Sequence, residues 1–219
     1  MNVIITGATG MVGGCALKYC LERQDVDHII SISRKSCGIK HEKLIEIIHE
    51  DFSDFTAASK HFKNQDVCVF CVGVYTGQVS TEEFKKITFD YTKAFADVLK
   101  KESPDAVISF LSGGGADEKE KSKMLFAREK GKAENYLKSL NFGAVHIFRP
   151  GYIYPVTQRK EPNFSYKLMR YLYKPFFSKF KTLSVTSEHL AAVMVDSAIL
   201  NKGKVVFENA DIIDYNIEK

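Results

Sequence analysis

The hydrophobic positions of this chain fall into short runs that are separated by longer amphipathic stretches. The short runs predict strands at Val3–Thr6, His28–Ser33, Leu44–Ile48, Val67–Val72, Ala106–Leu111 and Val145–Phe148, with a last strand near Lys204–Phe207. Apolar residues at helical spacing predict helices at Met11–Arg23, Phe55–Lys63, Glu82–Lys101, Glu120–Leu140 and Glu188–Leu200. Such alternation is typical of a parallel sheet with helices on both faces. Right-handed crossovers give the strand order 3-2-1-4-5-6, and the last run adds a seventh strand.

The stretch from Arg149 to Thr186 interrupts this alternation. It contains all the prolines except Pro104, together with a mixture of aromatic and basic side chains. We interpret the chain as one domain, 1–219, in which 152–186 covers the substrate. A lid over a cleft and plain packing of the aromatic rings against the sheet both account for this composition. Contact with a membrane surface is the less favoured alternative.

A glycine-rich turn follows the first strand directly. Its glycines have the spacing Gly-x-x-Gly-x-x-Gly, and an amphipathic helix comes next. Gly7 lets the chain reverse without a Cβ clash, Gly10 lets backbone N–H groups approach a pyrophosphate, and Gly13 lets the helix pack close to the strand. A generic strand–helix turn is the alternative. We predict a doubly wound Rossmann fold in which the turn binds a dinucleotide through Gly7, Thr9, Gly10, Met11, Val12 and Gly13.

The end of the second strand indicates which nicotinamide cofactor fits. An acidic residue at this place would bind the ribose 2′-hydroxyl and select NAD. This chain has Arg34 and Lys35 instead. The planar fork of Arg34 can pair with a 2′-phosphate and Lys35 adds a point charge, so we predict NADP(H) in preference to NAD(H). The alternative is that both are solvated loop cations.

Composition narrows the class of partner. The net charge of +4 suits a small anionic ligand and is too small to predict nucleic-acid binding. No apolar run is long enough for a signal peptide or a membrane span. Five cysteines, an odd number, argue against a disulfide framework, so a reducing cytoplasm is expected. We predict that Cys68 and Cys71 serve core packing rather than redox or metal chemistry, and no metal site is expected.

The glycine spacing, with Thr6 before it, resembles the short-chain dehydrogenase/reductase (SDR) superfamily. In the SDR pattern an Asp after the third strand contacts the adenine amino group and the next residue packs on the ring. Asp51 and Phe52 fit this pattern, although Asp51 or Asp54 could instead cap the helix Phe55–Lys63. The backbone at Cys71, Val72 and Gly73 would pass close to the adenosine ribose.

The SDR resemblance also implies a catalytic set. It consists of a Tyr-x-x-x-Lys pair on one helix turn and a Ser at the end of the fifth strand, which share proton transfer and orientation of the substrate oxygen. Ser112 and Lys130 match, but Phe126 stands where the Tyr is expected. Tyr136 lies nearly two turns past Lys130 and is a poor substitute. The proton would then come from water or from another residue such as Tyr75.

Two further motifs sharpen the resemblance. They are Lys130-Gly131-x-Ala133-Glu134 and Phe148-Arg149-Pro150-Gly151, and with them the chain resembles atypical SDR proteins of the Tat-interacting-protein oxidoreductase and NmrA-like group. The resemblance implies NADP(H) binding, with Pro150 and Gly151 at the cofactor, and a small C-terminal substrate region.

Three functions stay open at this point. The first is an oxidoreductase acting on a carbonyl or similar small-molecule substrate. The second is a catalytically silent NADP(H)-sensing regulator or scaffold, and the third is an enzyme like the nucleotide-sugar epimerases and dehydratases. A homodimer is an open alternative to a monomer.

Overall fold

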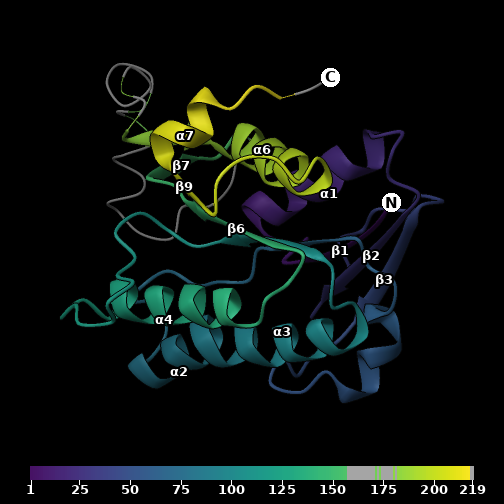
Figure 1. Ribbon diagram of the computed structural model, residues 1–219, viewed down its shortest axis with the longest axis horizontal. Coiled ribbons are helices and arrows are strands. Elements are labelled where there is room, and N and C mark those ends of the chain that lie inside the picture. Colours follow the sequence, from purple (N-terminus) through teal and green to yellow (C-terminus); the bar gives the residue numbers. More distant parts are fainter. Residues whose placement is uncertain (157–170, 172, 174–179, 181, 218–219) are drawn as a thin grey trace.

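A parallel sheet runs through the middle of the molecule in the computed structural model (Figure 1), which describes residues 1–156, 171, 173, 180 and 182–217. Its seven strands have the order β3-β2-β1-β4-β5-β6-β9. The strands are β1 (Asn2–Thr6), β2 (His28–Ser33), β3 (Leu44–Ile48), β4 (Val67–Phe70), β5 (Val107–Leu111), β6 (Ala144–Arg149) and β9 (Val206–Glu208). This confirms the predicted order and the seventh strand.

Helices cover both faces of the sheet, as Figure 1 shows. One face carries α1 (Met11–Glu22), α6 (Ser187–Ile199) and the short α7 (Asn209–Asp214). The other carries α2 (Thr81–Lys85), α3 (Tyr91–Glu102) and α4 (Leu125–Ser139). Because successive strand residues point to opposite faces, Val3 and Ile5 belong to the core under α1 and α6, whereas Ile4 belongs to the core under α3 and α4.

Three predicted helices differ in detail from the observed ones. The stretch predicted as Phe55–Lys63 is a 3₁₀ helix, η1 (Thr56–Phe62), and a π-helical turn, η2 (Lys86–Asp90), joins α2 to α3. Helix α4 begins at Leu125, not at Glu120. The Asp117 carboxylate accepts the backbone N–H groups of Lys119, Lys121 and Ser122, which folds this segment into a turn instead.

A second, two-stranded parallel sheet was not predicted. It consists of β7 (Tyr152–Tyr154) and β8 (Ser184–Thr186), the two ends of the segment interpreted as substrate-covering. Most of the intervening residues of 152–186 lie outside the described part of the chain, so the lid stays a prediction. Among the described helices, none is long and apolar enough to cross a membrane.

Close backbone contacts hold the glycine turn between β1 and α1. Gly7 has a φ of +73°, and a Cβ there would lie 2.7 Å from the carbonyl oxygen of Cys71. A Cβ on Gly13 would lie 2.3 Å from the Gly7 carbonyl oxygen. The structure thus gives Gly7 and Gly13 the turn and packing roles that the sequence predicts.

The substitution Gly13→Ala should destabilise the fold. The added methyl group has no space against the Gly7 carbonyl, and overpacking of this kind typically costs about 1–3 kcal/mol. Urea unfolding should show a lower midpoint. The control is Gly73→Ala, where an added Cβ meets nothing within 4 Å, and it should change the free energy of unfolding by less than about 0.5 kcal/mol. Equal stability of both variants would contradict the packing role of Gly13.

Candidate cofactor and substrate site

A cavity of about 800 Å³ opens at the carboxyl ends of β1, β4, β5 and β6. In doubly wound sheets this edge is where ligands bind. Its wall consists of Lys130, Ile153 and five chain segments: Gly10–Val12, Cys71–Thr76, Leu111–Gly114, Met124–Phe126 and Pro150–Gly151. Apart from Lys130, no charged side chain of the described residues lines it, so the cavity is predominantly apolar.

The structure brings most of the predicted site residues to this one cavity. Those that line it are Gly10, Met11, Val12, Cys71, Val72, Gly73, Ser112, Phe126, Lys130, Pro150 and Gly151. Gly7 and Gly13 do not line the cavity: Gly7 packs against the backbone of Cys71, and Gly13 packs against Gly7. Thr9 is exposed in the same turn. Sequence reasoning did not single out the apolar wall residues Leu111, Met124, Leu125 and Ile153, because apolar residues at strand ends and helix starts look like core.

Arg34 and Lys35 lie at the same edge of the sheet, outside the cavity wall. Strands β1 and β2 are parallel, and Thr6 is paired with Ile32, so Arg34 follows two residues beyond that pair. Both side chains are exposed. Within the described residues no carboxylate forms an ion pair with Arg34, which leaves its guanidinium available to a ligand.

Asp51 and Phe52 lie after β3 and have local roles in the structure. Asp51 is exposed and its carboxylate accepts the backbone N–H of Ser53 at 2.9 Å. Phe52 is only 3% exposed and packs edge-on against Phe55, with ring centroids 5.2 Å apart. In this arrangement its side chain is part of the aromatic core, and its packing on an adenine ring stays a prediction.

The helix-capping alternative for Asp51 is wrong. The carboxylate of Asp54, not that of Asp51, accepts the backbone N–H of Thr56 at 2.8 Å and also its hydroxyl, at the start of η1. Asp51 is therefore not used by the helix, and its predicted contact with adenine stays a prediction.

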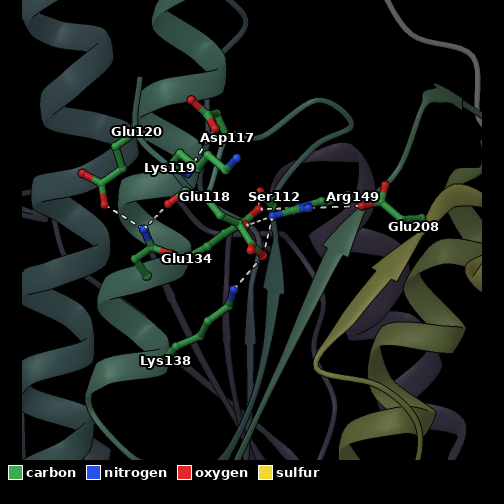
Figure 2. Close-up of polar contacts among 10 residues, drawn as sticks. Ser112, Asp117, Glu118, Lys119, Glu120, Glu134, Lys138, Arg149 and Glu208 are labelled. Carbon is green, nitrogen blue, oxygen red and sulfur yellow. Dashed lines mark hydrogen bonds and ion pairs between the residues drawn. The ribbon is translucent and has the colours of Figure 1, made fainter. Parts of the chain in front are cut away.

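Ser112 belongs to a polar network that ties the walls of the cavity together (Figure 2). Its hydroxyl donates a hydrogen bond to the carboxylate of Glu134, which comes from α4 and is fully buried. The guanidinium of Arg149, at the end of β6, pairs with the same carboxylate, with Nε 3.1 Å from Oε1. Arg149 also reaches Glu118 at 3.0 Å and Glu208 at 3.2 Å.

This network changes what Ser112 can do. A carboxylate paired with an arginine has only acceptor oxygens, so the single hydroxyl hydrogen of Ser112 points to Glu134. The SDR resemblance predicts that Ser112 orients a substrate oxygen. In this arrangement the hydroxyl has no hydrogen left to donate to that oxygen.

Lys130 is buried at the floor of the cavity. Its ammonium donates to the backbone carbonyl of Leu111 at 2.9 Å and lies 5.0 Å from the centre of the Phe110 ring. Burial lowers the pKa of Lys130 to about 8, although the carboxylate of Glu134 opposes the shift. Two of its three N–H bonds stay available for a ligand such as a ribose hydroxyl.

Phe126 occupies the place of the expected tyrosine. It lies one helical turn before Lys130 on α4, and both side chains line the cavity. A Cβ added at Gly113 would come within 2.5 Å of Phe126 Cζ, so the tip of the ring lies against Gly113, next to Ser112. The ring brings an apolar surface where a hydroxyl would be needed.

Two other tyrosines, Tyr136 and Tyr75, differ in whether they line the cavity. Tyr136 donates a hydrogen bond to Asp97 of α3 and does not line the cavity, so it is no substitute for the missing hydroxyl. Tyr75 does line the cavity, from the loop after β4. It is the one tyrosine among the described residues in that wall.

The two cysteines of the Cys-x-x-Cys sequence are free. Cys68 is fully buried in the core, as predicted. Cys71 lies in the cavity wall, and burial raises the pKa of its thiol to about 12, which makes it a poor nucleophile.

Comparison with known proteins identifies the family. Residues 7–199 match a protein-family model described as NAD(P)H-binding, which is most of the chain. The chain belongs to this NAD(P)H-binding family.

Curated relatives of this NAD(P)H-binding protein have low sequence identity, but two of them align with most of the chain. It is 26% identical to Protein HTATIP2 of Rattus norvegicus over 202 residues, which covers 91% of this chain and 80% of that protein. It is 24% identical to Protein FMP52, mitochondrial, of Saccharomyces cerevisiae over 98% of this chain and 96% of that one. The match to the FMP52 of Meyerozyma guilliermondii, 27% identical, covers 69% of this chain and 64% of that protein. These relatives confirm the resemblance to atypical SDR proteins of the Tat-interacting-protein type.

Solved structures show the same fold. The Bordetella bronchiseptica enzyme WbmH in complex with NAD⁺ matches with a TM-score of 0.71 at 15% identity, over 94% of this chain and 74% of that one. An SDR-family oxidoreductase from Burkholderia thailandensis matches with a TM-score of 0.69 at 13% identity, over 98% and 93%. A UDP-glucose 4-epimerase from Thermotoga maritima has a TM-score of 0.67 at 14% identity, over 95% and 76%. These matches confirm the Rossmann fold.

The buried ammonium of Lys130 should be visible in the pH dependence of stability. The pKa of Lys130 is about 8 in the folded protein and 10.5 in the unfolded chain. Between these two pH values the unfolded chain binds more protons at this side chain than the folded protein does. The free energy of unfolding of the wild type should therefore rise with pH relative to that of Lys130→Met. Urea unfolding of both variants from pH 7 to 10 measures this difference. A difference that does not change with pH would contradict a lowered pKa.

Proposed function

We propose that this protein binds NADP(H) in preference to NAD(H). The observation that carries the proposal is the pair of exposed cations, Arg34 and Lys35, at the carboxyl end of β2, where an NAD-selecting carboxylate would stand. No described carboxylate neutralises Arg34, and a 2′-phosphate is the ligand that its planar fork fits.

The cavity has the features that a nicotinamide cofactor needs. Gly10 and Gly73 lie in its wall. A Cβ added at Gly73 would meet no atom within 4 Å, and a Cβ added at Gly10 would meet only the carbonyl oxygen of Gly7. The space that these side chains would fill is left to the ligand. The positive end of α1 points to the same place, and Lys130 offers two N–H bonds to a ribose.

We further propose that the cofactor exchanges hydride with a small, predominantly apolar molecule in the cavity. The bound cofactor would supply the hydride chemistry. The residues of this chain bind and orient: Lys130 holds the ribose, and the Phe126 ring and the apolar wall exclude water. Neither Phe126 nor Ser112 takes the part of the tyrosine, because Phe126 has no hydroxyl and Ser112 donates to Glu134. The proton then comes from water or from Tyr75.

The phenylalanine at position 126 also favours a second candidate function, a catalytically silent NADP(H)-sensing regulator or scaffold. Reduction of a simple ketone produces an alkoxide, which needs a proton donor in the transition state. A site without that donor can bind the cofactor and still turn over slowly or not at all. Turnover of a panel of carbonyl substrates and quinones separates the two functions.

A nucleotide-sugar epimerase is the third and weaker candidate. Epimerases are among the structural neighbours, but the chain covers only part of the one from Thermotoga maritima. That chemistry, too, normally uses the tyrosine that Phe126 replaces. A cytoplasmic location and a homodimer stay predictions, and the names of the FMP52 relatives describe those proteins as mitochondrial.

The cofactor preference should depend on Arg34. Arg34→Ala should remove charge-assisted hydrogen bonds to the 2′-phosphate and weaken NADPH binding by about 1.5–3 kcal/mol while sparing NADH. The matched variant Arg34→Lys keeps the charge and loses the fork, so its NADPH affinity should lie in between. Fluorescence titration with both cofactors measures the effect. Equal loss of both would contradict the assignment.

Restoring the missing hydroxyl should create a carbonyl reductase. In Phe126→Tyr the new hydroxyl would stand one turn from the Lys130 ammonium, which favours its ionised form. General acid–base catalysis of this kind contributes about 10²–10⁴-fold in rate. NADPH oxidation with aldehydes and ketones should rise accordingly, whereas Phe126→Leu, the control without a hydroxyl, should not raise it. Robust wild-type turnover that Phe126→Tyr leaves unchanged would show that another group donates the proton.

A further inference from the structure

The loop between β2 and β3 is fastened to the sheet by one carboxylate. Glu46 lies in the middle of β3, the edge strand, and is paired in register with Ser31 of β2. Its Oε2 accepts the hydroxyl of Ser36 and its Oε1 accepts the backbone N–H of Cys37, each at 2.7 Å. These partners follow Arg34 and Lys35 directly along the chain.

Two further hydrogen bonds order the same loop, one before and one after the segment that Glu46 binds. The Gly38 backbone N–H donates to the Ser36 hydroxyl oxygen at 3.0 Å, and the buried Ser33 hydroxyl donates to the Lys35 carbonyl at 2.7 Å. Hydrogen bonds from Cys37 and Ser36 hold the pKa of Glu46 below its ordinary value. The backbone on either side of Arg34 is thus fixed before any ligand arrives.

We propose that Glu46 is a positioning residue for cofactor specificity, which holds the loop so that Arg34 and Lys35 meet the 2′-phosphate of NADP(H). The role rests on the proposed preference for NADP(H). It requires no contact between Glu46 and the cofactor. A loop that is already ordered spares the ligand the cost of ordering two long cationic side chains and their backbone.

The charge of Glu46 makes the proposal sharp. A carboxylate beside a phosphate site repels the phosphate, so a Glu without a positioning role would weaken NADPH binding, and its removal would strengthen it. If Glu46 positions the loop, its removal should instead weaken NADPH binding. A second alternative is that the packing of Cys37 and Ile39 against the core orders the loop by itself, in which case removal of Glu46 would change nothing.

The test compares the dissociation constants of NADPH and NADH for the wild type and three variants of the full chain. Glu46→Ala should weaken NADPH binding by about tenfold and leave NADH binding within about twofold. Glu46→Gln can still accept from the Cys37 backbone and donate to the Ser36 oxygen, so it should stay within about threefold of the wild type. Glu42→Ala removes the same charge from an exposed position before β3, at the opposite edge of the sheet, that makes no hydrogen bond with the described residues, and it should not weaken NADPH binding.

The outcomes separate the two proposals. An NADPH affinity of Glu46→Ala that equals or exceeds that of the wild type, while Arg34→Ala still loses the preference, overturns the positioning role alone. Equal loss of NADPH and NADH in Glu46→Ala also overturns it, because a general structural defect does not discriminate between cofactors. A wild type that binds both cofactors equally overturns the proposed preference for NADP(H), and the positioning role with it.

Discussion

The ion pair between Glu134 and Arg149 is the interaction on which the cavity depends. Glu134 comes from α4 and is fully buried, and Arg149 comes from the end of β6. Desolvation makes such a pair costly, and loss of Arg149 would leave the buried charge of Glu134 without its partner, which typically costs about 3–5 kcal/mol. The pair is satisfied on all sides by Ser112, Glu118 and Glu208 (Figure 2). It thereby connects α4, β6 and β9, and the cavity is lined by α4 and by the segments that follow β5 and β6.

Gly131 lets the backbone of the loop after β5 pack directly against α4. A Cβ there would lie 1.8 Å from the Asp117 carbonyl oxygen, so only glycine lets the loop after β5 lie against α4. The Asp117 N–H donates to the Ala127 carbonyl at 2.9 Å in that contact. The sequence Lys130-Gly131-x-Ala133-Glu134 therefore combines a ligand-facing cation, a docking point and an ion-pair partner within five residues.

The architecture could be predicted from the sequence because each strand of the main sheet is a separate apolar run and right-handed crossovers leave few orders open. The glycine turn could be predicted because its three glycines have local roles. Ser112 was predicted as a donor to the substrate, but its partner Glu134 lies 22 residues away and looks like an ordinary helix-surface charge. In the fold Glu134 is buried, and its partner Arg149 comes from β6, which the sequence of α4 does not reveal. The aromatic packing of Phe52 was missed for the same reason, since its neighbours are set by the tertiary fold.

The cavity therefore combines part of the glycine turn and the buried Lys130 with a phenylalanine at the place of the SDR tyrosine. We propose that Lys130 and the glycine turn bind the cofactor, and that Phe126 replaces the SDR tyrosine on the substrate side. Binding and turnover are separate properties in such a site, and they respond to different residues. In the function that we propose, Arg34 and Glu46 decide which cofactor binds, and Phe126 affects the reaction of the substrate.

The most direct measurement is a crystal structure of the protein with NADPH bound. The account predicts that the pyrophosphate lies over Gly10–Val12, the 2′-phosphate within hydrogen-bonding distance of Arg34, and the nicotinamide in the cavity between Lys130, Phe126 and Pro150. Density for the 2′-phosphate in solvent, away from Arg34 and Lys35, would contradict the proposed specificity. A nicotinamide ring outside the cavity would contradict the assignment of the site itself.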